Sequence, residues 1–517
     1  MDNYEKKNKK HSFAGTAVLM GVIILAAKLL GLVRDMLVAG HYGTSMEAVA
    51  YETASKLPVT IFDLVIGGVV TSAFIPVFNS LMVKKGKDEA MAFARSYVNF
   101  VLCITLVLSV VGILFASPLV SFMAPELDSA THTLAVQLTR ILFPMIIFTG
   151  LAFCFVGYLQ SMGEYNIPAL ISLVSNGIMV AYLLFLDTFC GIVGLAIAML
   201  LGWTAQAAVQ IPSVVRLGFR WSIRAPLKTE AIGRAAKNTL PILIGTWTGP
   251  VCNLINTRLA SGIEAGRGIT VLGYANRLYT ILVGLFSFVA TNLLFPYFSR
   301  AAASGDDEET DRLMRMSVKT LVYIIAPITV GIILLAEPFV AVIYENGSFT
   351  PSDTAMTGEA LRCYAVGMIF LAVNEVLVKA FFAAEKTRLP MYSSLCAMAV
   401  NIAVVAFFGE YLGIGGIALV SGGATAVNVG INWCFAARSR LMRFRGADGL
   451  DIAKTLVSAC VMIPAVLWAS SLAEADLVKL ILGAGAGMLV YFPLTILLRC
   501  DLCRAILQKK KGSSKSL

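Results

Sequence analysis

Positively charged residues inside long apolar stretches are the part of this sequence most able to do chemistry. Lys28, Arg34 and Lys56 stand in the first two stretches, and Arg258 and Arg277 stand in two later ones. A charge at the centre of a lipid bilayer costs at least ~2.5–3.5 kcal/mol, so each residue needs an ion pair, a wet cavity or a route to the surface. Arginine suits phosphate oxygens because its planar guanidinium donates to two of them at once.

Acidic residues on the same stretches are too few to neutralise these cations. Asp35 and Asp63 give two negative charges against five positive ones. A purely structural network would lie closer to neutrality, because an unpaired buried charge is strongly unfavourable. The surplus predicts that the cations bind an anionic substrate and that Asp35 and Asp63 support them. Arg95 and Lys319 stand near the ends of apolar stretches, where we expect their long side chains to reach the membrane surface.

The composition places these residues in a membrane protein. Of the 517 residues, 58% are apolar and 14% are charged, and the mean hydropathy is +0.80. Soluble domains carry roughly 45–50% apolar and ~25% charged residues. Fourteen apolar stretches are long enough for a membrane-spanning helix, which needs about 20 residues. They lie at approximately 13–39, 48–80, 91–116, 132–160, 167–187, 189–212, 238–261, 269–298, 318–344, 358–384, 389–408, 412–437, 452–472 and 477–498.

The segments that connect these stretches differ sharply in charge. Alternate segments, which include both termini, hold 28 of the 41 Lys and Arg residues, whereas the segments between them hold only Arg267. Because cytoplasmic loops are enriched in Lys and Arg, we expect both termini in the cytoplasm. This distribution also accounts for the net charge of +10, so we expect no nucleic-acid partner.

Three short motifs recur at a nearly constant distance. Residues 73–78 match 293–298, 117–120 match 337–340, and 191–196 match 413–418, at offsets of 220, 220 and 222. The offset indicates an internal duplication, with two copies in the same orientation and a binding site expected between them. We therefore predict an all-α polytopic membrane protein with fourteen transmembrane helices, arranged as two parallel six-helix repeats and a C-terminal helix pair. The predicted domains are 1–225, 226–445 and 446–517, the last including a basic tail.

Residues for metal binding or catalysis are scarce. The one close cysteine pair is Cys500 and Cys503, and a zinc site would need two further ligands. None of His11, His41 and His132 stands at the middle of an apolar stretch. No long extramembrane segment is present to hold an active site. We expect no metal, no cofactor and no enzymatic activity.

Three motifs resemble those of one transporter family. Residues 28–35 (KLLGLVRD) resemble the first-helix signature of the MurJ (MviN) lipid II flippases, which belong to the MOP exporter superfamily. Lys56-Leu57-Pro58 followed by residues 72–76 (SAFIP) is similar to their second-helix motif. Residues 274–278 (YANRL) are similar to their eighth-helix motif. The resemblance extends over essentially the whole chain, including the extra C-terminal helix pair.

This resemblance implies a function and a set of site residues. The family carries undecaprenyl-diphosphate-linked peptidoglycan precursor from the inner to the outer leaflet of the bacterial cell membrane. Lys28, Arg34, Asp35 and Arg277 would correspond to functional residues of the family, and Glu47 to an acidic residue of its first outer loop. Helices 13 and 14 of the family form a groove for the polyprenyl tail, which would correspond to residues 452–498.

The chain departs from the family at one turn of the second helix. Many members carry basic residues a few positions after the Lys-Leu-Pro motif, where this chain has Phe62 and Asp63. Lys56 is therefore the only cation on that helix.

Two alternatives keep the same fold. A flippase for another polyprenyl-diphosphate-linked oligosaccharide would need the same cations. A drug exporter of the superfamily fits less well, because it would favour acidic cavity residues. We expect lipid II and the surrounding membrane lipids as partners, and a monomer, because the pseudo-dimer already lies within one chain.

Overall fold

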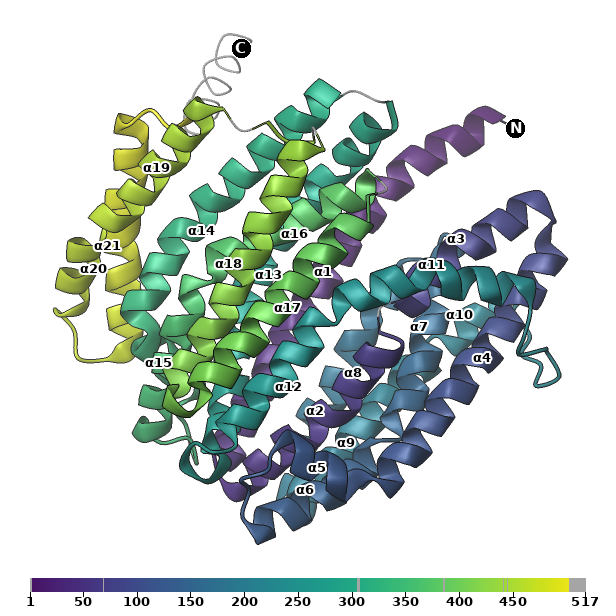
Figure 1. The fold of residues 1–517 in the computed structure, drawn as a ribbon, viewed down its shortest axis with the longest axis horizontal. Coiled ribbons are helices and arrows are strands. Elements are labelled where there is room, and N and C mark those ends of the chain that lie inside the picture. Colours follow the sequence, from purple (N-terminus) through teal and green to yellow (C-terminus); the bar gives the residue numbers. More distant parts are fainter. Residues whose placement is uncertain are drawn as a thin grey trace. The chain divides into compact units, whose positions relative to one another are not determined.

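The computed structural model describes residues 2–67, 69–304, 307–384, 386–439, 441–443 and 445–501, and within these ranges it contains helices and no strand. The basic tail predicted after the last helix lies mostly outside the described residues, as does Cys503. The chain divides between Thr270 and Val271 into two compact units (Figure 1). Each unit is described by itself below.

The first unit contains the helices up to the start of α13. They are α1 (Asp2–Tyr42), α2 (Met46–Val65), α3 (Val69–Lys84), α4 (Lys87–Leu114), α5 (Ala116–Met123), α6 (Ser129–Leu142), α7 (Met145–Ser161), α8 (Asn166–Phe185), α9 (Asp187–Ala208), α10 (Ile211–Arg216), α11 (Glu230–Thr246), α12 (Thr248–Ala260) and the 3₁₀ turn Glu264–Gly266. α1 packs along α8, α2 packs on α6, and α7 packs between α3, α4 and α9. One hydrophobic core, which includes Phe74, Phe78 and Tyr158, joins most of these helices.

Several of the predicted apolar stretches are broken helices, and two of the breaks occur at a glycine and a proline. The stretch 48–80 becomes α2 and α3, which are separated at Gly67. Gly67 has a φ of +47°, and a Cβ there would lie 2.8 Å from the backbone oxygen of Asp63, so the break requires glycine. The stretch 132–160 becomes α6 and α7, with Pro144 just before α7, where its missing N–H leaves no helical bond unmade.

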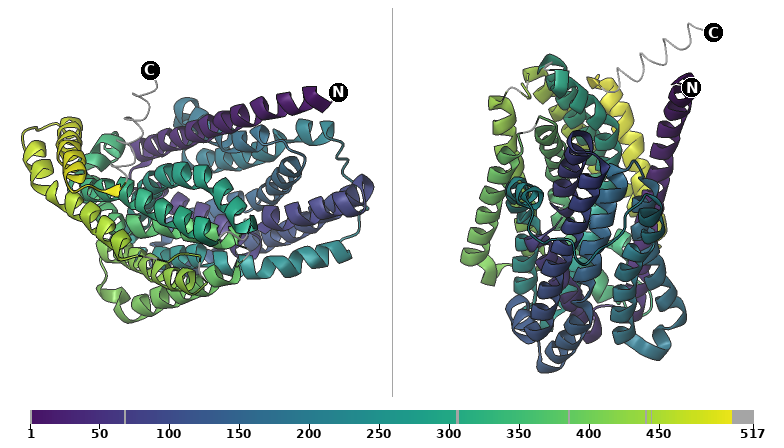
Figure 2. Two further views of the ribbon diagram at one scale, coloured as in Figure 1. Left: turned by 90° about the horizontal axis from the view of Figure 1, so that it is seen from above. Right: turned by 90° about the vertical axis from the view of Figure 1, so that its right-hand side faces the viewer.

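The second unit begins within α13 (Arg267–Ser304). It continues with α14 (Asp307–Tyr344), α15 (Pro351–Val366), α16 (Met368–Ala383), α17 (Arg388–Phe408), the 3₁₀ turn Gly409–Tyr411, α18 (Ile414–Arg438), α19 (Gly446–Val461), α20 (Ile463–Ser470) and α21 (Asp476–Leu497). α18 packs on α15, α16 and α17. The C-terminal helices α19–α21, drawn in yellow-green to yellow, form one group against α14 (Figures 1 and 2).

The two units contain corresponding helix pairs. α9 packs on α6, α7 and α8 in the first unit, as α18 packs on α15, α16 and α17 in the second. α4 packs on α7, as α14 packs on α16. The C-terminal helices α19–α21 have no counterpart in this correspondence.

Polar contacts inside the two units correspond as well. Gln206 Nε2 donates to Ser175 Oγ at 2.9 Å, and Asn428 Nδ2, 222 residues later, donates to Ser394 Oγ at 3.5 Å. The next turn repeats this relationship. Gln210 donates to the backbone oxygen of Ala152 at 3.2 Å, and Asn432 donates to Asn374 Oδ1 at 3.0 Å, here with an offset of 222 for donor and acceptor alike.

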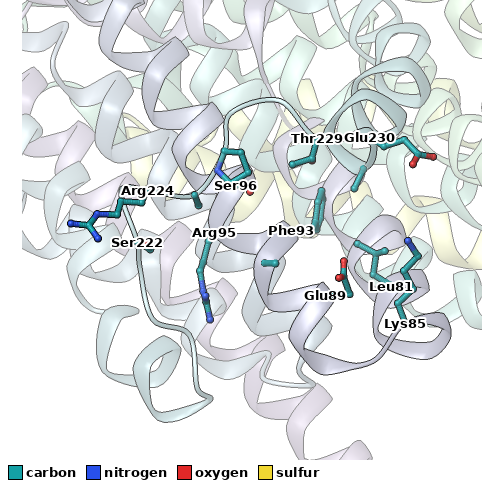
Figure 3. Close-up of a pocket in the computed structure, with 14 residues that line it drawn as sticks. Leu81, Lys85, Glu89, Phe93, Arg95, Ser96, Ser222, Arg224, Thr229 and Glu230 are labelled. Carbon is teal, nitrogen blue, oxygen red and sulfur yellow. The ribbon is translucent and has the colours of Figure 1, made fainter.

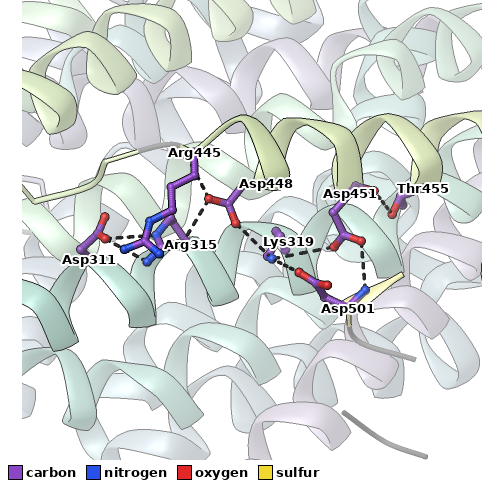
Figure 4. Close-up of polar contacts among 8 residues, drawn as sticks. All are labelled: Asp311, Arg315, Lys319, Arg445, Asp448, Asp451, Thr455 and Asp501. Carbon is purple, nitrogen blue, oxygen red and sulfur yellow. Dashed lines mark hydrogen bonds and ion pairs between the residues drawn. The ribbon is translucent and has the colours of Figure 1, made fainter. Parts of the chain in front are cut away.

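Ion pairs fasten α19 and Asp501, which follows α21, to α14 (Figure 4). Lys319 Nζ lies 3.1 Å from Asp448, 3.9 Å from Asp451 and 2.6 Å from Asp501. Arg315 bridges Asp311 at 3.0 Å and Asp448 at 3.3 Å. We call these six residues the Lys319 cluster. Lys319 was expected to reach the membrane surface, and the structure shows that three carboxylates surround its ammonium.

The helices are those of a multi-pass membrane protein. In the described part of the chain, nine helical segments are long and apolar enough to span a bilayer, and the pair α15–α16, bent by 47°, makes a tenth if it is one span. Four of the fourteen predicted stretches are not among these, namely 13–39, 48–80, 238–261 and 269–298. These four are also the ones that carry Lys28, Arg34, Lys56, Arg258 and Arg277.

Candidate functional site

Arg34 is held in place by two helices of the first unit. On α1, its Nε and Nη2 donate to Asp35 Oδ1 at 3.0 and 2.7 Å. From α8, Asn176 Oδ1 accepts a hydrogen bond from Nη1 at 2.9 Å. The side chain of Arg34 keeps 26% of its exposure, whereas that of Asp35 keeps 5%. Asp35 is therefore a supporting partner, and two guanidinium N–H groups of Arg34 are left to bind another group.

Asn176 is a member of this arrangement that the sequence prediction missed. Its Nδ2 donates to the backbone oxygen of Ala27 at 3.2 Å, which fixes the amide so that its oxygen faces Arg34. A Cβ at Gly31 would lie 3.2 Å from the same Nδ2, so α1 and α8 approach closely at this point. A neutral polar residue in an apolar stretch was the available signal, but it was not connected with Arg34.

Lys28 lies on α1 two turns before Asp35 and is half-buried. Among the residues that the structure describes, no hydrogen bond or ion pair engages its ammonium group. A half-buried, unpaired ammonium on a membrane helix retains its full capacity to bind an anion.

Lys56 forms an ion pair that the sequence prediction also missed. Its Nζ lies 3.2 Å from Glu52 Oε1, one turn earlier on α2, and the two side chains keep only 16% and 6% of their exposure. The Nζ also donates to the backbone oxygen of Ile269 at 3.5 Å. The acid-first spacing of four residues was the signal for this pair. With Glu52 included, the predicted balance of five cations to two acids becomes five to three, which still leaves a positive surplus.

The two other acidic candidates stand at opposite ends of α2. Glu47 lies in its first turn, where Ser45 caps the helix. Asp63 lies in its last turn beside the break at Gly67 and is half-buried. In the described part of the chain, neither carboxylate forms a hydrogen bond or ion pair.

Phe62 is buried and stacks on Phe153, with ring centroids 6.0 Å apart, so this turn of α2 packs into the core on one side.

Arg258 and Arg277 are engaged by aromatic rings. Arg258, exposed near the end of α12, lies over the ring of Phe122 with its Cζ 5.4 Å from the centroid and donates to the backbone oxygen of that residue. Arg277, half-buried on α13 in the second unit, lies 5.8 Å from the ring centroid of Tyr274. Tyr274 is in turn fixed by the rings of Tyr344 and Phe349. An aromatic face holds a guanidinium without neutralising it.

Among the described residues, no group of three His, Cys, Asp or Glu side chains is placed to hold a metal ion.

The candidate site residues are cations that neighbouring side chains hold in place. Arg34 and Lys56 have carboxylate partners on their own helices, and Arg258 and Arg277 lie against aromatic rings.

The chain is similar to proteins of known family. The family model for "Lipid II flippase MurJ" matches residues 38–484. The chain is 29% identical over 408 residues to a "Probable lipid II flippase MurJ" of Rhizobium meliloti, covering 77% of this chain and 76% of the relative. It is 25% identical over 420 residues to the "Lipid II flippase MurJ" of Burkholderia cenocepacia, covering 79% of each.

Solved structures show the same fold. A lipid II flippase MurJ in an inward closed conformation superposes with a TM-score of 0.82 at 24% identity, covering 94% of this chain and 99% of that one. A multidrug resistance transporter of the MATE family, in the MOP superfamily, gives a TM-score of 0.67 at 15% identity, covering 82% and 98%. With a family model that matches most of the chain, the protein belongs to the MurJ family of lipid II flippases.

Proposed function

We propose that this protein moves lipid II from the inner to the outer leaflet and binds its diphosphate with Lys28, Arg34, Lys56, Arg258 and Arg277. The observation that carries the proposal is the surplus of cations on these helices, which persists after the Asp35 and Glu52 pairs are counted. A diphosphate supplies the missing negative charge, and the free N–H groups of Arg34 match its oxygens. A flippase makes and breaks no covalent bond, so the protein is not an enzyme.

The four stretches that carry the five cations line the diphosphate path in this proposal. Asp35, Glu47 and Asp63 are supporting residues that tune the cations.

The proposed architecture has fourteen transmembrane helices in two parallel six-helix repeats, 1–225 and 226–445, with a C-terminal pair in 446–517. The corresponding helix pairs of the two units support the repeat. So do the amide contacts of Gln206 and Asn428, which stand 222 residues apart. Alternating access would rock one repeat against the other around a fixed site.

The proposed orientation puts both termini in the cytoplasm of a bacterial cell, with the chain in the inner membrane as a monomer. The distribution of Lys and Arg between the alternate segments supports this orientation. The unrepeated helices α19–α21 would bind the polyprenyl tail along their exposed apolar side, which includes Trp468, Leu489 and Leu497.

A flippase for another polyprenyl-diphosphate-linked oligosaccharide would use the same cations, and the test below separates it from a lipid II flippase. Drug export is the second candidate, favoured by the fold that the chain shares with a multidrug resistance MATE transporter. A positive surplus on the site helices opposes it, because it would repel cationic drugs.

The test is lipid binding by the purified full-length protein in native mass spectrometry. Lipid II is offered beside an undecaprenyl-diphosphate lipid that bears a different sugar, to wild type, Arg277→Ala and the control Arg140→Ala, which removes an exposed arginine of α6. The proposal expects wild type and the control to prefer lipid II, and Arg277→Ala to lose it. Equal binding of the two lipids would contradict lipid II as the specific cargo, and unchanged binding by Arg277→Ala would contradict the site.

A further inference from the structure

A cationic pocket lies in the first unit, away from the residues discussed so far. It has a volume of about 360 Å³ and is formed by the end of α3, the first turns of α4, the connection after α10 and the start of α11 (Figure 3). Lys85, Arg95 and Arg224 line it together with Glu89 and Glu230. Its lining therefore carries three positive and two negative charges over an apolar floor that includes Phe93.

The cations of this pocket have no protein partner. Among the described residues, no ion pair or hydrogen bond engages the side chains of Lys85, Arg95 or Arg224. Arg95 is half-buried, and Lys85 and Arg224 are exposed. An anion in the pocket would therefore meet three cations that no described carboxylate engages.

One wall of the pocket is fastened to α4 by a single buried amide. Asn99 Nδ2 donates to the backbone oxygens of Ser222, Ile223 and Ala225 at 2.9, 3.3 and 3.1 Å. Its Oδ1 accepts a hydrogen bond from Trp221 Nε1 at 2.8 Å. The connection after α10 is thus held in one conformation over the pocket, so Arg224 is presented by a fixed segment.

The pocket lies along the first turns of α4, before the apolar part of that helix. Its α4 residues lie between Glu89 and Ser96, within the first ten residues of the helix, or about 15 Å at 1.5 Å per residue. Beyond Asn99 the helix is apolar up to Leu114. Charged lining above an apolar floor, at the start of a spanning helix, is the setting in which a phospholipid headgroup lies.

We propose that this pocket binds the phosphate group of an anionic lipid headgroup, with Arg95 and Arg224 donating to the phosphate oxygens. Phosphatidylglycerol is the headgroup that fits best, because its single negative charge balances the net positive charge of the lining and its hydroxyls can donate to Glu89. In Figure 3 the two arginines lie toward one end of the pocket, and Lys85 and Glu89 lie toward the other. This site is separate from the proposed transport site and does not depend on it.

The experiment compares two double variants of the full-length protein that lose the same charge. Arg95→Gln/Arg224→Gln removes the two pocket arginines. Lys84→Gln/Arg220→Gln removes two exposed cations of the neighbouring segments that do not line the pocket. Retention of phosphatidylglycerol is measured by native mass spectrometry. Each cation near an anionic headgroup contributes about fivefold, so we expect roughly 25-fold weaker retention for the pocket variant and near wild-type retention for the control. Equal loss in both variants would overturn the proposal.

Two further arms identify the source of the phosphate and guard against misfolding. Lys85→Gln changes an exposed rim residue, and we expect it to weaken retention about fivefold while Lys84→Gln leaves it unchanged. Inorganic phosphate and phosphatidylcholine are offered as competitors, and neither is expected to displace phosphatidylglycerol. Displacement by inorganic phosphate would overturn the lipid source, and equal binding of phosphatidylcholine would overturn the requirement for an anion.

Discussion

The ammonium of Lys56 lies 3.2 Å from the carboxylate of Glu52, one turn earlier on α2, and both side chains are largely buried. The ammonium of Lys56 is held in place by two partners, this carboxylate and the backbone oxygen of Ile269. A substrate phosphate would therefore compete with Glu52 for the same ammonium, and the separate roles of the pair can be tested.

Lys56→Ala leaves the carboxylate of Glu52 buried without its cation. Removing one partner of a buried pair is strongly destabilising, and we expect a loss of about 3 kcal/mol. The double variant Glu52→Ala/Lys56→Ala removes both charges and should recover most of this stability, as measured by thermal unfolding of the purified protein. If Lys56 also binds lipid II, the double variant folds and still binds the lipid weakly. Wild-type lipid binding by the double variant would restrict Lys56 to a structural role.

Asn176→Ala tests whether the amide on α8 positions Arg34. The variant removes an acceptor 2.9 Å from Nη1 and frees the guanidinium to rotate toward Asp35. We expect about tenfold weaker lipid II binding, because hydrogen bonds to charged groups contribute roughly 1.5–3 kcal/mol, with little change in expression. Asn166→Ala, at the start of the same helix, is the control. Equal behaviour of the two variants would mean that Asn176 serves packing alone.

Apolar stretches in the sequence located most of the helices closely but not their breaks. The predicted stretch 167–187 corresponds to α8 (Asn166–Phe185), and 477–498 corresponds to α21 (Asp476–Leu497). Hydropathy depends on composition, which does not change across a kink, so the break at the left-handed Gly67 was not predicted. The count of fourteen spans stays a prediction.

The site residues could be identified from the sequence because a charge in a membrane-spanning stretch is energetically costly, but their partners could not. A cation in an apolar stretch is unusual whatever it contacts, so Arg34 and Arg258 were predicted from their positions alone. Their contacts come from 142 and 136 residues away, and the carbonyl of Phe122 leaves no signal in the sequence. Glu52 was missed although its spacing from Lys56 is local.

Gly112 on α4 has no room for a side chain. A Cβ there would lie 1.9 Å from Cε1 of Phe143, a fully buried ring. Gly112→Ala should therefore lower the thermal unfolding temperature, since overpacking costs about 1–3 kcal/mol. Gly485→Ala on α21, where no atom lies within 4 Å of the new Cβ, is the control and should be neutral or slightly stabilising. Phe143→Leu combined with Gly112→Ala should restore part of the loss, and the absence of any recovery would contradict this contact as the cause.

Lys319→Met tests how α19 and the end of α21 are held to α14. The variant leaves the buried carboxylates of Asp448 and Asp451 without their shared cation, and we expect a loss of about 3 kcal/mol. Asp501→Asn should cost much less, because Asp501 is 56% exposed and exposed ion pairs contribute ~1 kcal/mol or less. Thermal unfolding at low and high salt measures both. Equal losses for the two variants would show that burial does not decide the strength of the Lys319 cluster.

Arg277→Lys keeps the charge on α13 and removes the planar fork. If Arg277 binds a diphosphate with two parallel hydrogen bonds, a lysine cannot replace it fully, because an ammonium acts as a point charge. We expect partial complementation of a strain depleted of its own flippase and about tenfold weaker lipid II binding, between wild type and Arg277→Ala. Arg140→Lys on α6 is the matched control and should behave as wild type. Full activity of Arg277→Lys would show that positive charge alone is sufficient at this position. The cation–π contact with Tyr274, which either side chain can make, would then be enough to position the charge.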